Sequence, residues 1–521
     1  MKKSLLALVL TLVMLLSLAA PALVLAEEEP QDVVEIDFMY MSSTFDPIDW
    51  GADPTTAQFT EKTGVKLITS APAGDWEQVA NAMLAAGNYP SMMHLDHGTV
   101  FNKYVRAGAL ESIGALAEEY GYTSIIDGTY IPEESLSVRK SEDGELYMVP
   151  NWFSEDGFGS VGQTISVRND IYADMGNPEL ETVDDLYAFL EQVRDANLTY
   201  NDVKVWPLNV AFTDYNMIGN VANMWGSQIC RYMYYNEETG RVELMLRNDT
   251  VEQALTFLNK AYNEGILDPE SLTFNGTQMS EAYVQGRYAV TIDWFWNMWT
   301  ANSALSQVEP DVYYRSIPVV AGAEGVTPYL GYDHRAGTSG TVITKNCKDK
   351  EAAMRFIDYY LSEEGQILEF YGVTGYTCEI IDGTPYLMDG VYDDLMADWN
   401  GYRRTHGVRI FDIMMNQKYN WERRQESPDR QENRRIATEC AFNATKLINI
   451  NVDAATSEGI LNAEIENGLA AELTKIIIAE DAAKIPTMIG DLISRYEGSG
   501  LVALEDEWTR QWDVMTANEQ A

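Results

Sequence analysis

The chain has 521 residues, of which 46% are hydrophobic and 22% are charged, a mixture typical of folded globular proteins and not of disordered or fibrous ones. With 80 acidic residues against 36 basic ones, the formal net charge is −44, which disfavours nucleic acid and anionic lipid as partners. The 12 tryptophans and 30 tyrosines are many for so acidic a chain, and such flat amphipathic rings often serve in recognition of flat apolar faces.

The N-terminus has the pattern of a secretory signal peptide over residues 1–26. Two lysines precede the apolar run Leu5–Leu16, and the segment ends at Ala26 among small residues that a signal peptidase reads, just before three glutamates. An uncleaved membrane anchor is the alternative. We expect an exported protein, located outside the cell or in the cell envelope. No cysteine precedes Cys230, so the sequence predicts no lipid anchor of its own.

Strand and helix patterns alternate along most of the chain. The predicted strands cover residues 34–38, 65–67, 92–95, 146–150, 164–168, 288–293 and 340–345. The predicted helices cover residues 76–86, 183–193 and 251–262, and two more end before Gly64 and at Gly365. A capping box at residues 182–185 begins the helix over 183–193. After about residue 385 the chain is predicted to be mostly helical. This alternation indicates an α/β fold with largely parallel sheets.

Metal, cofactor and catalytic motifs are scarce. The chain has no Cys-x-x-Cys pair, no helical His-x-x-x-His spacing, no calcium loop, no Gly-x-Ser-x-Gly and no phosphate-binding loop, so we expect no cofactor, no metal and no assigned catalytic residue. The four cysteines are too few for a disulfide scaffold, and although three full pairings are open, lone buried thiols are the simplest expectation. They are Cys230, Cys347, Cys378 and Cys440.

Tryptophans follow one predicted strand at its carboxyl end. Trp294 and Trp296 come directly after the strand that ends at Asp293, which is where ligands bind in open α/β sheets. An indole presents a large face to the C–H side of a sugar ring, while carboxylates and amides bond to its hydroxyls. A plain core cluster is the alternative. We predict that these three residues contact a ligand.

Other aromatic and polar residues follow strands or loops in the same manner. Asn151 and Trp152 follow one predicted strand, and Asp96 and His97 follow another, so each pair is predicted to line a cleft, although His97 is also consistent with a structural histidine. Two more candidates are Trp225, after a loop rich in Asn and Asp, and Arg335, for which an ion-pair role is the alternative. The basic stretch 403–435 is interleaved with acids and is predicted to be a salt-bridged face.

The order of several motifs resembles family 1 of the extracellular solute-binding proteins of bacterial ABC importers. This family includes maltose-binding protein, and the similarity is strongest to its large LplA-like branch. The resemblance spans residues 30–380 clearly and the remainder weakly. The stretches that carry it are 59–66 (FTEKTGVK), 82–90 (AMLAAGNYP), 283–290 (YVQGRYAV) and 341–365.

The resemblance implies a two-lobe fold like that of the periplasmic binding proteins: two α/β lobes, joined by a hinge of crossing segments, that close over a ligand in an interlobe cleft. We expect residues 27–150 plus 293–370 in the first lobe and residues 151–292 plus 371–521 in the second. Crossings are expected near 149–153, 292–296 and 368–376. Trp296 matches the tryptophan that stacks on sugar in the maltose branch, and Asp96 and His97 match a cleft-lining loop. The absent lipobox cysteine departs from this branch.

The resulting hypothesis is a non-catalytic, monomeric receptor. It would bind a carbohydrate, specifically a neutral oligosaccharide, by hinge closure and deliver it to the permease subunits of an ABC transporter. Two alternatives stay open. A secreted glycoside hydrolase requires two carboxylates about 5–10 Å apart across the cleft. A receptor of the same fold for a peptide or another solute is equally compatible with the fold.

Overall fold

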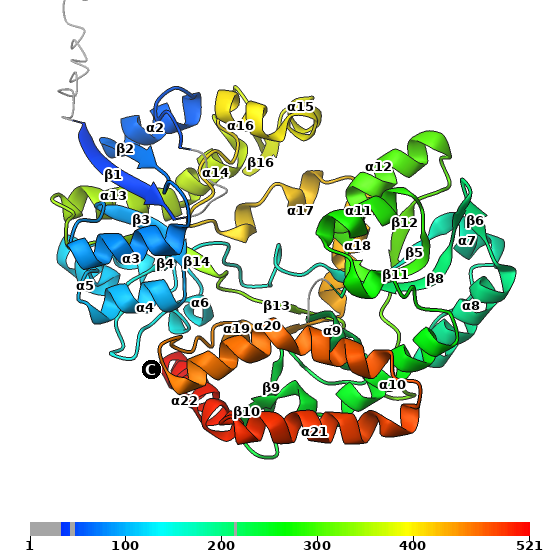
Figure 1. Cartoon of the computed structure of the whole chain (residues 1–521). Coiled ribbons are helices and arrows are strands. Elements are labelled where there is room, and N and C mark those ends of the chain that lie inside the picture. Colours follow the sequence, from blue (N-terminus) through cyan, green and yellow to red (C-terminus); the bar gives the residue numbers. More distant parts are fainter. Residues whose placement is uncertain (1–32, 42–46, 213–215, 521) are drawn as a thin grey trace, which may run out of the picture.

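The computed structural model describes residues 33–41, 47–212 and 216–520, so the predicted signal peptide lies outside the described residues. The described chain forms two lobes, each with a β-sheet and helices packed on it, and a block of mostly C-terminal helices lies beneath them in the view of Figure 1. The predicted two-lobe α/β fold is therefore confirmed.

The first lobe is built on a five-stranded sheet in the order β2-β1-β3-β14-β4. β1 pairs in parallel with β2 and β3, whereas β14 arrives from much later in the chain and pairs antiparallel with β3 and β4. The strands are β1 (Val34–Tyr40), β2 (Val65–Ser70), β3 (Met92–Asp96), β4 (Val149–Pro150) and β14 (Ser339–Ile343). The helices are α2 (Pro54–Thr63), α3 (Trp76–Ala86), α4 (Thr99–Arg106), α5 (Ile113–Tyr120), α6 (Glu133–Ser137), α13 (Lys350–Leu361) and α14 (Glu363–Tyr371).

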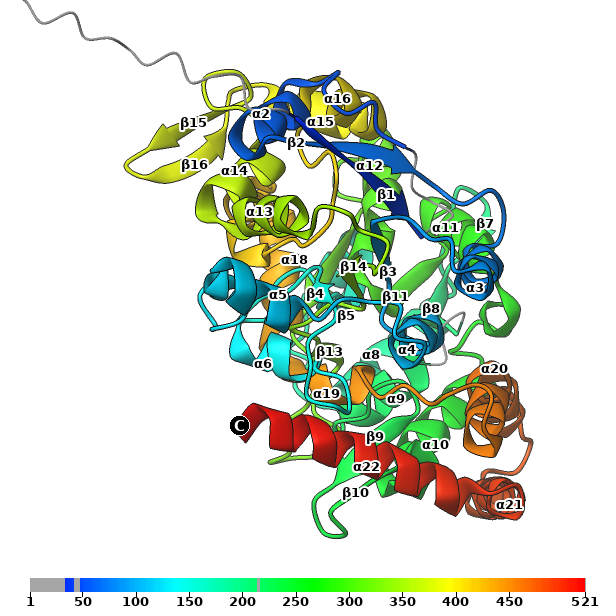
Figure 2. The same cartoon turned by 90° about the vertical axis from the view of Figure 1, so that its left-hand side faces the viewer.

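A satellite of short elements packs on α14 at the edge of this lobe. It consists of the hairpin β15 (Cys378–Ile381) and β16 (Thr384–Leu387), with helices α15 (Val391–Ala397) and α16 (Trp399–His406). The hairpin projects from the lobe, as the side view shows (Figure 2). Residues 410–414 then return to the core of the first lobe, where Phe411 packs edge-on against Trp50.

The second lobe is built on a four-stranded sheet in the order β12-β5-β11-β8. β11 pairs in parallel with β8 and antiparallel with β5. The strands are β5 (Gln163–Arg168), β8 (Trp206–Val210), β11 (Tyr288–Trp294) and β12 (Tyr314–Ile317), beside the small pair β6 (Thr199–Tyr200) and β7 (Val203–Lys204). The helices around this sheet are α7 (Asn169–Asp174), α8 (Val183–Ala196), α11 (Gly276–Val284), α12 (Met298–Val308) and α18 (Pro428–Glu439).

The lower block shares one continuous hydrophobic core with the second lobe. Its helices are α9 (Asn216–Asn223), α10 (Asp249–Asn263), α19 (Thr445–Ile448), α20 (Ser457–Ile477), α21 (Ile485–Gly498) and α22 (Leu501–Gln520). The hairpin β9 (Met233–Asn236) and β10 (Arg241–Leu244) lies against α22. Trp508 of α22 is completely buried, so the last helix is an integral part of this core.

The helix boundaries follow local capping chemistry. α2 ends at Gly64, whose φ of 66° requires a residue without a Cβ penalty, as predicted. The predicted capping box is present, because the Thr182 hydroxyl accepts from the Asp185 amide while the Asp185 carboxylate accepts from the Thr182 amide. One helix end was predicted wrongly. Ser362, not Gly365, ends α13, since its side chain caps a new helix, α14, by accepting from the Gly365 amide.

The lobes are joined by three segments, and two of them lie elsewhere than expected. The first crossing, residues 151–162 between β4 and β5, begins where the sequence predicted. The second was expected near 292–296, but β12 pairs with β5 and α12 packs on α11, so the chain returns to the first lobe only over residues 318–338. The third was expected near 368–376, but it lies at residues 416–427, between the first-lobe segment and α18.

These positions correct the expected division of the chain. Residues 293–317 belong with the second sheet, and residues 371–415 belong with the first lobe and its satellite. The reason is physical: hydrophobic periodicity predicts that a strand or helix forms, but the partner sheet is decided by pairing and packing distant in sequence.

The crossing segments pack closely on one another. β13 (Gly331–Asp333) in the second crossing pairs in parallel with β17 (Ala441–Asn443), and Phe153 forms a bridge with Asn416. An added Cβ at Gly337, whose φ is +61°, would lie 1.9 Å from the Asn151 carbonyl oxygen. The first and second crossings are therefore in backbone contact at this point, and only glycine permits that approach.

The cysteines lie in the interior of the protein. All four cysteine side chains are buried, as predicted. No helix in the part of the chain that the structure describes is long and apolar enough to cross a membrane.

Candidate functional site

Two stacked indole rings lie where β11 ends. The turn η4 (Phe295–Asn297) leads from the strand into α12, and it places the rings of Trp294 and Trp296 with centroids 4.6 Å apart and planes at 28°. Both side chains are half-buried. An added Cβ at Gly162 would lie 2.1 Å from the Trp296 ring, so this ring rests directly on the backbone of the first crossing. The tryptophan pair is therefore located at the connection between the lobes.

Asp293 stabilises the turn that carries this pair through hydrogen bonds from the turn to its side chain. The side chain is 3% exposed and accepts hydrogen bonds from the Tyr283 hydroxyl at 2.6 Å, from the Trp294 amide at 2.7 Å and from the Asn297 side-chain amide at 3.0 Å. Three donors occupy the two carboxylate oxygens within the protein. These bonds hold the turn that carries the two indoles.

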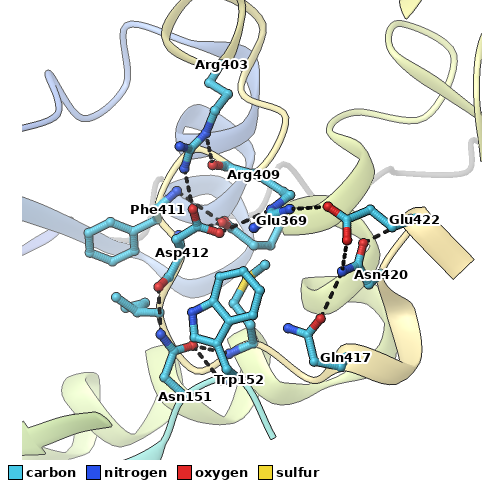
Figure 3. Close-up of polar contacts among 12 residues, drawn as sticks. Asn151, Trp152, Glu369, Arg403, Arg409, Phe411, Asp412, Gln417, Asn420 and Glu422 are labelled. Atoms are coloured by element: carbon cyan, nitrogen blue, oxygen red, sulfur yellow. Dashed lines mark hydrogen bonds and ion pairs between the residues drawn. The ribbon is translucent and has the colours of Figure 1, made fainter. Parts of the chain in front are cut away.

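Asn151 and Trp152 lie at the other end of the first crossing (Figure 3). The Asn151 side chain donates to the Asp412 carbonyl at 2.9 Å and accepts from the amides of Met415 at 2.8 Å and Trp152 at 2.9 Å. These bonds join the first crossing to the segment that precedes the third. Trp152 has a left-handed backbone, with φ of 57°, and its half-buried ring lies 5.0 Å from the Arg409 guanidinium.

A network of ion pairs lies beside the Trp152 ring, and no motif in the sequence indicated that it would lie there. Arg403 pairs with Asp412 at 2.6 Å, and Arg409 pairs with Asp412 at 3.3 Å and with Glu422 at 3.2 Å (Figure 3). The predicted salt bridging of the stretch 403–435 is confirmed, but the Arg409 side chain is only 6% exposed, so the network is an internal one. It holds a loop in which Arg409 and Asp412 both have positive φ.

The two carboxyl groups in this network ionise differently. Burial disfavours the charged form of Asp412, but Arg409 and Arg403 outweigh it and keep the pKa of Asp412 below its usual range. Glu369 accepts from the amides of Phe411 at 3.0 Å and Asp412 at 2.8 Å. Burial, with the nearby Asp412 charge, raises the pKa of Glu369 to about 7. The two arginines thus favour the charged form of Asp412, while the carboxyl of Glu369 titrates near neutral pH.

Asp96 and Tyr40 lie on the same side of the first lobe as this network. Asp96 ends β3 and keeps part of its surface in solvent, and partial desolvation of the carboxylate together with the Glu77 charge raises its pKa. Tyr40 stacks on His94 with ring centroids 4.5 Å apart. Burial raises the pKa of the Tyr40 phenol, and the charges of Asp412 and Asp96 add to the effect. Asp96 is the one sequence candidate in this group with an exposed carboxylate.

His97 points away from Asp96 into a different environment. It lines a cavity of about 530 Å³ between α4, residues 138–143 and the C-terminal helices, and its ring lies 5.2 Å from Phe101. Its carbonyl accepts from the Asn451 side chain at 2.6 Å. Burial and the nearby Arg139 cation keep the pKa of His97 well below its ordinary value. These contacts are those of a neutral structural histidine.

Trp225 and Arg335 are not gathered with the other candidates. Trp225 lies between α8 and α10, with its ring 6.2 Å from Phe257, in a pocket that none of the other candidate residues line. Arg335 pairs with Glu134 at 3.1 Å and with Asp333 at 3.6 Å. The ion-pair alternative for Arg335 thus describes its side chain in this structure.

The structure therefore assembles its candidate site from two groups at the ends of the first crossing. The second-lobe group is the tryptophan pair with Asp293 beneath it. The first-lobe group combines predicted with unpredicted residues: Asn151, Trp152 and Asp96 with Tyr40, Trp399, Arg403, Arg409 and Asp412. Among the described residues, no group of three or more His, Cys, Asp or Glu side chains is arranged to hold a metal ion.

Comparison with known proteins identifies the class that this two-lobe fold defines. The family model of the bacterial extracellular solute-binding proteins matches residues 51–367, which is more than half of the chain. The chain belongs to this family, and its family and fold are those of binding proteins.

Among curated proteins, the chain is similar to lipoprotein LipO of Bacillus subtilis, with 23% identity over 342 residues. The match covers 63% of this chain and 65% of that lipoprotein, so the chain spans slightly less than two-thirds of its relative's length.

Two solved structures share the fold over nearly the whole chain. An HMO-binding, ABC-transporter-associated solute-binding protein from Bifidobacterium longum infantis superimposes with a TM-score of 0.72 at 15% identity, covering 92% of this chain and 98% of the other. The substrate-binding protein FusA of an S. pneumoniae ABC transporter, in complex with kestose, gives a TM-score of 0.68 at 16% identity, with coverages of 93% and 100%. At these identities the likeness shows the fold alone.

Proposed function

We propose that this protein is the receptor of an ABC importer and that it binds a neutral oligosaccharide between its two lobes. The observation that carries the proposal is the stacked pair Trp294–Trp296 at the carboxyl end of β11, beside the first crossing. Half-buried indoles at a strand end offer apolar faces to the C–H side of a sugar ring, and this is where ligands bind in open α/β sheets. The oligosaccharide ligands of the fold neighbours, HMO and kestose, support the same ligand class.

The charges around the first-lobe group favour an uncharged ligand. Arg403 and Arg409 are both held in ion pairs with Asp412, and Arg409 also pairs with Glu422. An anionic sugar would have to compete with these carboxylates for the cations. Asp96 adds an exposed acceptor for sugar hydroxyls. Trp152, Asp96, Trp294 and Trp296 are accordingly the residues proposed to touch the ligand, and Asn151 and Asp293 position them.

The proposal includes the partners and location of such a receptor. Hinge closure about the three crossings would trap the oligosaccharide and present the closed protein to the permease subunits. The protein would act as a monomer outside the cytoplasm, without a lipid anchor of its own. Mass spectrometry of the exported protein tests the last point, because a mature chain that starts near Glu27 without acylation is expected, whereas an acylated or uncleaved N-terminus contradicts it.

Binding and catalysis are separated by one experiment. The purified mature protein is titrated calorimetrically with a panel of neutral tetra- to hexasaccharides, and the same mixtures are assayed for new reducing ends. We expect at least one saccharide to bind and to raise the melting temperature, since a ligand stabilises by RT ln(1 + [L]/Kd), with no reducing ends released. Released reducing ends would support a glycoside hydrolase instead. Stabilisation by peptides alone would support a receptor for another solute.

A further inference from the structure

A second pocket lies on the second lobe, away from the candidate site between the lobes. It has a volume of about 640 Å³, within the range of small-ligand sites. It opens between α8 and α10, and Trp225 forms part of its wall. The lining residues also include three acids, one lysine and two uncharged polar residues, which are Asp184, Asp249, Glu252, Lys260, Gln253 and Thr256.

Trp225 is held so that its packing is one-sided. A Cβ added at Gly322 would lie over the indole, 2.3–2.5 Å from three of its atoms. Because glycine has no Cβ, the ring can lie flat on the backbone at this position. Phe257 contacts the indole edge-on at 61°. The side chain stays half-buried and lines the pocket with the remainder of its surface. A tryptophan backed by glycine and open on the pocket side has the form of a stacking platform.

The charge of this pocket decides which ligands fit it. Asp184, Asp249 and Glu252 are exposed to solvent. They lie in the first turns of α8 and α10, where their negative charges also interact favourably with the helix dipoles. The Lys260 ammonium lies 3.8 Å from the centre of the Tyr187 ring. Three carboxylates against one lysine disfavour anions and leave several acceptors for hydroxyl donors.

We infer that this pocket is a second saccharide-binding site, in which Trp225 stacks on the C–H face of a sugar unit and carboxylate oxygens accept from its hydroxyls. Gln253 and Thr256, exposed on the same face of α10, add an amide and a hydroxyl to the wall. The site is open and has one platform, so its affinity is expected to be weaker than that of a site closed by two lobes. This inference does not depend on ligand binding at Trp296.

Fluorine NMR tests the two sites separately in the same protein. The mature chain is labelled with 5-fluorotryptophan, and the resonances of Trp225 and Trp296 are assigned with the variants Trp225→Phe and Trp296→Phe. The probes are the neutral tetra- to hexasaccharide panel and, as a cationic control, choline. We expect at least one saccharide to shift the Trp225 resonance, with a midpoint different from that of any Trp296 shift, and the Trp225 shift to persist in Trp296→Phe.

A second variant keeps the interpretation independent of the folding of Trp225 variants. Glu252→Gln changes one exposed carboxylate, leaves the indole in place, and should weaken the Trp225 titration roughly threefold to tenfold without altering that of Trp296. A Trp225 resonance that stays unchanged with every saccharide while Trp296 responds overturns this inference alone. So does a Trp225 shift that disappears in Trp296→Phe, or one produced by choline and not by sugars. Silence of both resonances contradicts this inference and the proposed function together.

Discussion

Replacing Trp296 by alanine removes one ring of the stacked pair. The structure gives the expected size of two separate losses, one in stability and one in ligand binding. A fully buried tryptophan costs about 3–5 kcal/mol when it is truncated, so half-buried Trp296 should lower the free energy of unfolding by about 2 kcal/mol. Loss of a stacking platform should cost a further 1–3 kcal/mol, roughly, in binding. We therefore expect the Kd for the bound saccharide to rise roughly tenfold to a hundredfold. Calorimetric titration and urea denaturation measure the two losses.

A tryptophan in the same sheet supplies the matched control. Trp206 begins β8, at the opposite end of the sheet from the carboxyl end of β11, and it is also half-buried. Trp206→Ala should lower stability by a similar amount and leave the Kd unchanged. Gly162→Ala keeps both indoles but adds a Cβ 2.1 Å from the Trp296 ring, so it should weaken binding by displacing the platform. If Trp296→Ala binds as tightly as Trp206→Ala, the stacking argument is wrong.

Three further changes test the groups at the crossings. The pKa of Glu369 is raised to about 7, so the folded protein holds a proton that the unfolded chain releases, and this group should make unfolding easier as pH rises from about 4.5 to about 7. In urea titrations, the free energy of unfolding of Glu369→Gln should rise by about 1–3 kcal/mol relative to that of the parent over that pH interval. A difference in unfolding free energy that does not change with pH would refute the assignment. Arg409→Met leaves two carboxylates without this cation and should lower the free energy of unfolding by about 3–5 kcal/mol. An unchanged midpoint of urea denaturation would show that the network is dispensable. Gly337→Ala should lower the free energy of unfolding by about 2–4 kcal/mol, because the new Cβ meets the Asn151 carbonyl. Gly325 also has a positive φ but lies in open space, so Gly325→Ala should lower it by only about 1 kcal/mol. Equal losses would contradict the packing argument.

Local signals allowed much of the fold to be predicted from the sequence. Gly64 ends α2 and Thr182 caps α8 as expected, because caps and stops depend on neighbouring residues only. The tryptophans after β11 were recognised for the same reason, since their position at a strand end is visible in the sequence. Asp293 shows the limit of that reasoning. Adjacency to the strand end could not reveal that Tyr283 and Asn297 occupy its oxygens.

Features that depend on distant pairing could not be predicted. β12 has an ordinary strand sequence, and its pairing with β5, about 150 residues earlier, moved the second crossing past the expected position. Trp152 was a candidate, but its partner Arg409 lies more than 250 residues later in a segment where the family resemblance is weak. Trp225 was a candidate because it follows a loop rich in Asn and Asp, and only the packing of α8 and α10 shows that it lies in a separate pocket.

The insertion of β14 between β3 and β4 has a consequence for how this protein is made. A growing chain cannot complete the first sheet until residue 343 is available, and the core of that lobe also needs residues 410–414. The second lobe and the lower block that shares its core wait still longer, because α18 packs on β12 and α22 packs on β10. Contacts of such sequence separation slow folding and leave strand edges unprotected in the meantime. The first lobe is therefore complete only after residue 414, and the second lobe with the lower block only near the end of synthesis. A chain truncated before α22 should persist as an aggregation-prone intermediate.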